Sequence, residues 1–384
     1  LEKLKQTQPS FIKGQVIGAF TFGTSTLDTE QVSANPLVDS VQRVSAPYKM
    51  ASRSFHPENS IIKIGKSTFA SCFELIEINI PNKLETIPEN FVQNCYKLTS
   101  VTIPSSVKTI DNYAFRGVAF ENVIIPDTVT SLGQYAFSAN GHLQSITFGK
   151  GITIIPKYCL LNCSKITKII FNGKVTELQE SAFCGLDSLE DFDMPETVTT
   201  LGNAVFYRCK KLKTINLPNS ITSIGSSAFS TCSALNNITI PNELLIIKDY
   251  VFNLCSSLTD VTLNTKVTQI CESAFDGTAI SDIDLRKCTS LTTIKMYAFN
   301  SCKELTEVRL NNGLRVVQSY SFNSCKLLNK IYIPADVYGI RANAFSNLHA
   351  DAMIYCYAPF KGSDWADNWY GTVKTENIIW NYTD

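Results

Sequence analysis

The residues best suited to chemistry are sparse in this chain. Its three histidines, His56, His142 and His349, stand far apart, and none belongs to a zinc-binding or nucleophile motif. Gly65-Lys66-Ser67 has the ending of a phosphate-binding loop, but Ser60 stands where that loop needs a glycine. No Gly-x-Ser-x-Gly occurs in the sequence. With no nucleophile and base fixed by the sequence, we predict that the protein is not an enzyme and holds no cofactor or metal.

Cysteines are the second source of chemistry, and the chain has thirteen of them. A zinc site is not expected, because Cys159 and Cys163 are the nearest approach to a ligand pair and lack a matching second pair. Disulfide partners must face each other, whereas equivalent positions of stacked repeats point the same way. We therefore predict a buried, reduced column of thiols. Eight cysteines share one repeat position: Cys72, Cys95, Cys163, Cys209, Cys232, Cys255, Cys302 and Cys325.

An internal repeat sets the spacing of these residues. Eleven phenylalanines, with Val92 and Leu160 filling two gaps, form thirteen anchors at 69, 92, 115, 137, 160, 183, 206, 229, 252, 275, 299, 322 and 345. Ten of the twelve intervals are 23 residues, one is 22 and one is 24. A unit of this length cannot bury enough apolar surface to fold alone, so the units must stack. The sequence therefore predicts a solenoid of about 12–13 units.

The pattern inside a unit is clearest at residues 212–235. Leu212-x-x-Ile215-x-Leu217-Pro218 alternates apolar and polar residues and ends on proline, which predicts a short strand. Ile221 and Ile224 return at wider spacing, which favours a turn or short helical segment on the opposite side. We therefore expect one long parallel sheet along one side of the solenoid.

The unit Leu-x-x-Ile-x-Leu/Ile-Pro…Ile-Gly-x-x-Ala-Phe-x-x-Cys-x-x-Leu resembles the BspA-like class of leucine-rich repeats over about residues 60–350. The resemblance implies an α/β solenoid wound as a right-handed superhelix. It also implies a bacterial or protist protein, secreted or displayed on the cell surface, that acts as an adhesin. The units around Phe115 and Phe275 depart from the pattern with a shorter glycine-containing turn, and a longer turn runs through Arg286-Lys287-Cys288.

The two ends of the chain do not keep the repeat. Residues 1–55 are predicted to be an N-terminal cap or linker, residues 56–350 the leucine-rich repeat solenoid, and residues 351–384 a C-terminal aromatic cap. All three tryptophans, Trp365, Trp369 and Trp380, fall in the last segment, where they can seal the core of the final unit. Binding of an aromatic ligand is the alternative for them. Residue 1 is Leu rather than Met, so we expect a processed chain that has lost any export signal or anchor.

Outward residues of the predicted sheet are free of core packing and line up across turns. In the second half of the chain they gather carboxylates, which predicts either a solvated face or a docking surface for a basic partner or a divalent cation. We predict that a protein-binding face includes Asp191, Asp193, Asp260, Asp282, Asp284, Glu307, Arg309, Lys330 and Tyr332.

Composition narrows the choice of partner. Lys plus Arg and Asp plus Glu are both 34, with no dense basic tract, which argues against nucleic acid. No apolar run approaches the ~18 residues that span a bilayer, so no membrane insertion is expected. We expect protein partners, including host extracellular or serum proteins. The alternative is a structural or assembly module of a larger surface protein that has no ligand of its own.

Overall fold

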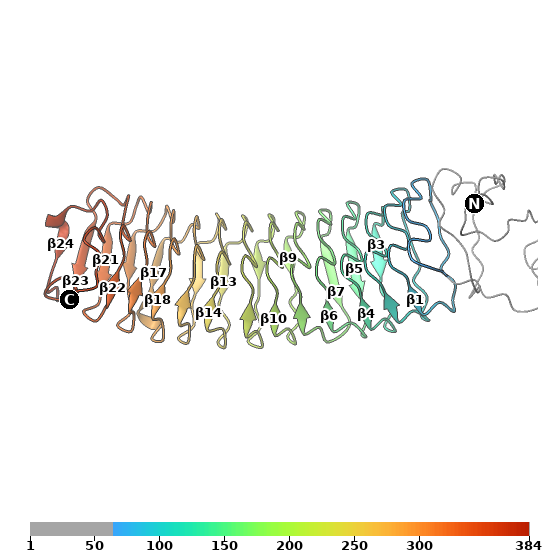
Figure 1. Ribbon diagram of the computed structural model, residues 1–384, viewed down its shortest axis with the longest axis horizontal. Helices are drawn as coiled ribbons and strands as arrows, with labels where there is room; N and C mark the ends of the chain where they lie inside the picture. Colours follow the sequence, from blue (N-terminus) through green and yellow to red (C-terminus); the bar gives the residue numbers. More distant parts are fainter. Residues whose placement is uncertain (1–63, 384) are drawn as a thin grey trace, which may run out of the picture. The chain divides into compact units, whose positions relative to one another are not determined.

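The computed structural model describes residues 64–383, which fall into two compact units, Leu1–Val175 and Thr176–Asp384. Within each unit, successive turns of chain lie side by side and carry short strands (Figure 1). The repeating solenoid is thereby confirmed. The described residues hold no α-helix, only the 3-10 segments η2 (Leu285–Lys287) and η3 (Thr375–Asn377), so the helical share expected of an α/β solenoid is replaced by turns. The predicted N-terminal segment 1–55 lies outside the described residues.

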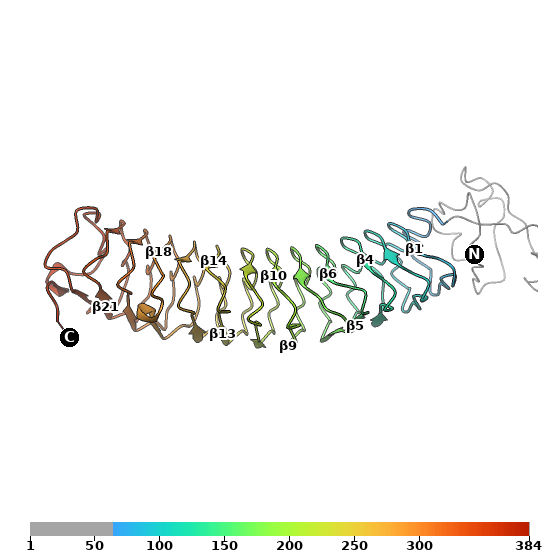
Figure 2. The ribbon, with the colours of Figure 1, turned by 90° about the horizontal axis from the view of Figure 1, so that it is seen from below.

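From Asn122 to Ile340 each repeat carries two short strands, so the prediction of one sheet needs correction. In the unit that ends at Val175, the two rows of strands lie on different sides of the turns (Figure 2). The first row, ordered β3-β5-β7, comprises β3 (Asn122–Ile124), β5 (Ser145–Phe148) and β7 (Lys168–Phe171). The second row comprises β1 (Thr86–Ile87), β2 (Thr109–Ile110), β4 (Ser131–Leu132) and β6 (Ile154–Ile155).

The unit that starts at Thr176 also has two rows of strands, and its paired strands run parallel. Its first row comprises β9 (Asp191–Phe192), β11 (Thr214–Ile215), β13 (Asn237–Thr239), β15 (Asp260–Thr262), β17 (Asp282–Asp284), β19 (Glu307–Arg309), β21 (Lys330–Ile333), β23 (Met353–Cys356) and β24 (Ile378–Ile379). Its second row comprises β8 (Glu177–Leu178), β10 (Thr200–Leu201), β12 (Ser223–Ile224), β14 (Ile246–Ile247), β16 (Gln269–Ile270), β18 (Thr293–Ile294), β20 (Val316–Val317) and β22 (Gly339–Ile340).

A left-handed backbone recurs two residues before and two residues after each anchor. Around Phe115 these residues are Tyr113 and Gly117, with φ of 57° and 67°. Positive φ is what the third residue of a type II turn requires, and glycine and asparagine tolerate it best. Between them the Phe115 N–H donates to the Ala136 carbonyl of the next turn at 2.8 Å. The turns therefore add a third ladder of hydrogen bonds between repeats.

The anchor phenylalanines form the centre of the core. Phe229 is fully buried, and its ring stacks on Phe206 and Phe252 with centroids 5.5 and 5.6 Å apart. The column continues past the last anchor, because the buried Trp369 packs edge-on against Phe345 at 6.1 Å. Trp369 thus covers the end of the phenylalanine column. This contact gives the segment predicted as an aromatic cap a defined place above the final repeat.

The cysteine column has a hydrogen-bonding role that the sequence did not reveal. All thirteen cysteines are free and buried, so the predicted burial of the column is confirmed. The Cys232 thiol donates to the Phe206 carbonyl of the preceding repeat at 3.1 Å. Where asparagine replaces cysteine, the Asn140 side-chain amide donates to the Phe115 carbonyl at 3.0 Å. In these repeats the corner supplies a small donor to an otherwise buried carbonyl oxygen.

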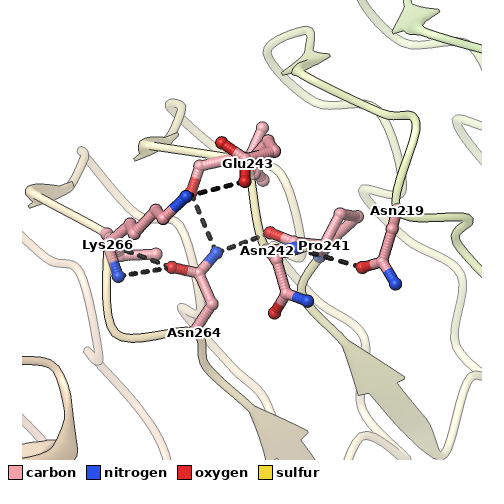
Figure 3. A network of polar contacts seen from close by, with 8 residues as sticks. Asn219, Pro241, Asn242, Glu243, Asn264 and Lys266 are labelled. Carbon is pink, nitrogen blue, oxygen red and sulfur yellow. Dashed lines mark hydrogen bonds and ion pairs between the residues drawn. The ribbon is translucent and has the colours of Figure 1, made fainter.

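An asparagine network holds the turn after β15, where other repeats place proline (Figure 3). The Asn264 side-chain amide donates to the carbonyls of Pro241 and Leu244 at 2.6 and 3.0 Å. Its side-chain oxygen accepts from the N–H groups of Lys266 and Val267 at 2.7 and 3.0 Å. One buried side chain thus both closes its own turn and fastens it to the preceding turn.

Candidate binding face

Three neighbouring strands bring six of the nine predicted site residues together. Parallel pairing of β17, β19 and β21 places Asp282, Glu307 and Lys330 in one register column. The second column holds Asp284, Arg309 and Tyr332. Residues between these positions, such as Val308, are buried in the core, so strand alternation turns the two columns outward. We call these six residues the β17–β21 face.

The other three predicted residues lie elsewhere in the same unit. Asp260 is exposed on β15, which pairs with β13. Asp191 is exposed on β9, which pairs with β11, and Asp193 is exposed just after that strand. Asp191 and Asp260 therefore lie in register with residues of β11 and β13, not with the β17–β21 face.

The Asp284 carboxylate is fixed by the short segment that follows it. It caps η2 by accepting from the Arg286 backbone N–H at 3.1 Å. The Arg286 guanidinium then makes two further bonds to the same carboxylate, from Nε at 2.9 Å and Nη2 at 2.7 Å. These bonds from Arg286 lower the pKa of Asp284 below its ordinary value. The two side chains form a bidentate ion pair at the edge of the face.

Arg309 is held on two sides. Its Nε donates to the Glu307 carboxylate at 2.6 Å, and its guanidinium carbon lies 3.9 Å from the centre of the Tyr332 ring. The hydrogen bond to Glu307 raises the pKa of Arg309. Stacking of a guanidinium on an aromatic ring is favourable and restricts its rotation. Two of the predicted acidic residues, Asp284 and Glu307, are therefore paired with arginines.

A cluster of tyrosines continues the face toward the C-terminus. Tyr332 stacks on Tyr355 with centroids 4.9 Å apart, and Tyr355 contacts Tyr382 at 4.7 Å. Tyr357 meets Tyr382 edge-on at 5.6 Å. Burial, with the nearby Glu307 carboxylate, raises the pKa of Tyr332. We call these four residues the tyrosine cluster.

Two adjoining hollows open on this surface. The first has a volume of about 350 Å³ and is lined by Asp282, Ile283, Asp284, Arg286, Thr306, Glu307 and Arg309. The second has a volume of about 400 Å³ and is lined by Arg286, Arg309, Leu310, Asn312, Tyr332, Pro334, Ala335, Asp336 and Tyr357. Both are shallow, and the two arginines form the wall between them.

Carboxylates of this region have hydroxyl or guanidinium partners rather than one another. The Ser281 hydroxyl donates to Asp282 at 3.2 Å, and the Thr259 hydroxyl donates to Asp260 at 2.7 Å. In residues 64–383, no three histidine, cysteine, aspartate or glutamate side chains gather as a metal site. The arrangement is suited to hydrogen bonding.

Sequence reasoning missed Arg286 and three members of the tyrosine cluster. Tyr355 stands 23 residues after Tyr332, so the repeat length alone could have placed it on the face. Arg286 lies in an insertion, where the repeat gives no position for its side chain. Tyr382 reaches the cluster from beyond β24, and no pattern in the sequence marks it.

Comparison with protein families identifies the repeat. The model of the BspA type leucine rich repeat region matches residues 13–119, 108–236 and 222–350, which together are most of the chain. The chain belongs to the BspA-type leucine-rich repeat family. No curated protein matches this BspA-type chain. Its described residues include no helix long and apolar enough to cross a membrane.

Solved structures similar to this BspA-type protein come from several bacteria. A leucine-rich repeat protein from Bacteroides ovatus is 27% identical, with 76% of this chain and 80% of that chain covered and a TM-score of 0.64. One from Eubacterium ventriosum is 23% identical, with coverage of 68% and 80% and a TM-score of 0.45. A leucine rich cell surface protein from Faecalibacterium prausnitzii is 22% identical, with coverage of 72% and 87% and a TM-score of 0.37.

Proposed function

We propose that this BspA-type protein is a non-enzymatic, secreted or surface-displayed binding protein that engages other proteins through its exposed sheet face. Host extracellular or serum proteins are the proposed partners. The observation that carries the proposal is the β17–β21 face, where Arg309 bonds to Glu307 and stacks on Tyr332, and Asp284 bonds to the neighbouring Arg286. Such pre-organised groups lose little conformational freedom on binding.

The scaffold supports this function in a second way. The strand pairing holds each outward side chain in register with its neighbours, so a partner meets an ordered array over several turns. Solenoid repeats commonly use such extended surfaces for binding. A shallow face of this kind suits a large partner better than a small molecule, which needs a deeper pocket.

The test is capture of proteins by the full chain from a panel of extracellular matrix and serum proteins, with and without calcium. We expect saturable binding of at least one protein, weakened at least tenfold by the double variant Asp282→Ala/Asp284→Ala. The matched control is Asp187→Ala/Glu190→Ala, which removes one half-buried and one exposed carboxylate that pair with Lys210 and Lys213. Failure of every protein to bind would favour the structural or assembly module instead.

A further inference from the structure

The two hollows differ in their walls although they share two arginines. Carboxylates and guanidinium groups line the first. The second combines an apolar side, formed by Leu310, Tyr332, Pro334, Ala335 and Tyr357, with the polar groups of Arg286, Arg309, Asn312 and Asp336. A ligand that fills both must therefore present hydrogen-bonding groups along one edge and an apolar surface along another.

The ion pairs argue against a strongly charged ligand. Each guanidinium already bonds to a carboxylate two residues away, Arg286 to Asp284 and Arg309 to Glu307. An anion would have to exchange one ion pair for another, which gains little at a half-exposed site. Hydroxyl groups can instead accept from the remaining N–H groups of Arg309 and donate to carboxylate oxygens without breaking either pair.

The backbone of β19 and β21 offers nothing to an extended peptide. β19 pairs with β17 and β21, and β21 pairs with β19 and β23. Addition of a peptide strand requires unpaired edge groups, which are absent from β19 and β21. Recognition over β19 and β21 therefore depends on their side chains.

We propose that the two hollows bind neutral pyranose units of an oligosaccharide carried by the partner proteins. A pyranose ring has an apolar C–H face and a rim of hydroxyl groups, which matches the side of the second hollow that Pro334, Ala335 and Tyr357 form and the ion pairs between the hollows. Hydroxyl groups both donate and accept, as paired carboxylates and guanidinium groups require. This inference rests on the proposed function, since it names what the partner presents to the face.

The direct experiment applies the full chain to immobilised neutral oligosaccharides built from glucose, galactose, mannose or N-acetylglucosamine. Sialylated and sulfated oligosaccharides and unglycosylated peptides serve as comparators, and calorimetry measures the tightest hit. We expect saturable binding of a neutral oligosaccharide that Arg309→Met weakens at least tenfold. Arg315→Met is the matched control, because Arg315 is exposed just before β20 in the second row of strands. Circular dichroism melting of both variants checks that they fold.

Three results would overturn the inference: no neutral oligosaccharide binds, only anionic oligosaccharides or peptides bind, or Arg309→Met binds as tightly as the unaltered chain. A second arm separates it from the proposed function. If a captured partner protein binds equally well after treatment with glycosidases, the inference fails while the proposed function stands. Loss of binding after that treatment supports both.

Discussion

The strand sets β3-β5-β7 and β17-β19-β21 share one backbone arrangement but carry different outward side chains. Both sets are parallel and pair residue for residue in the same register. In the first set the outward column reads Ile124, Thr147 and Ile170, and Ile124 is 72% exposed. In the second it reads Asp284, Arg309 and Tyr332, and its members are tied to Arg286, Glu307 and Tyr355.

The interior of the two faces does not differ in this way. Ile146 of β5 and Val308 of β19 occupy equivalent inward positions, and both are fully buried. The backbone and core therefore leave the outward side chains free to vary. Binding capacity in this fold is a property of those outward residues, whereas stability belongs to the anchor, cysteine and turn positions.

The largest effect should come from raising the pH, because it acts on the buried thiols of many repeats at once. Burial raises the pKa of Cys163 and Cys255 to about 12. Unfolded cysteines ionise near pH 8.5, so their contribution to stability is complete below that pH and is lost as the pH rises toward the folded pKa. Each such thiol costs about 1.4 kcal/mol per pH unit in this window. We expect the chain to unfold between about pH 9 and 10. Circular dichroism under reducing conditions measures this transition.

A folded chain at pH 11 would contradict that expectation. The same thiols provide a control at fixed pH. Denatured protein should titrate thirteen thiols, and native protein at pH 8 should titrate almost none.

The next largest effect on the free energy of unfolding is expected from a single substitution in the core, compared with one on an outward side of a strand. Phe229→Ala removes a fully buried ring stacked on both sides and should lower the free energy of unfolding by about 3–5 kcal/mol. Thr214→Ala, on the outward side of β11, should change it by less than about 0.5 kcal/mol. Urea unfolding measures both free energies. Equal losses of stability would contradict the claim that the core, and not the outward side chains, stabilises the fold.

A smaller loss is expected at the asparagine network of Figure 3. Asn264→Ala leaves backbone groups of two turns without partners and should cost about 1–3 kcal/mol. Asn242→Ala is the matched control, because that side chain is exposed in the preceding turn. An Asn264→Ala protein as stable as the control would show that water replaces the network.

The smallest effect on stability should be that of the face itself. The side chains of Arg309 and Glu307 are 26% and 32% exposed, so solvent and salt screen their pairing. A double-mutant cycle with Arg309→Met and Glu307→Gln should give a coupling energy of about 0.2–1 kcal/mol that shrinks as salt is added. A coupling energy above about 3 kcal/mol, as for a buried ion pair, would show that this pair contributes substantially to the stability of the fold.

The sequence could predict the repeated core positions but not the contacts of the outward side chains. The anchors and cysteines were predictable because one interval repeats them many times, and so were the first strands, where Thr214-Ile215-Asn216 alternates. The second row was missed because a strand such as Ser223–Ile224 is two residues long and shows no alternation. The arginine pairings on the face depend on rotamers, and Arg286 lies in an insertion, so repeat arithmetic could not give them.

The most direct test of this account transplants one face onto the other frame. The variant Asp282→Asn/Asp284→Ile/Glu307→Ser/Arg309→Thr/Tyr332→Ile gives β17, β19 and β21 the outward residues of β3, β5 and β7, since Lys168 already matches Lys330. Surface plasmon resonance would compare its affinity for the captured extracellular protein with that of the unaltered chain. We predict a folded protein whose binding is weakened at least a hundredfold. A folded variant that binds with unchanged affinity would contradict the claim that outward side chains of this face carry the function.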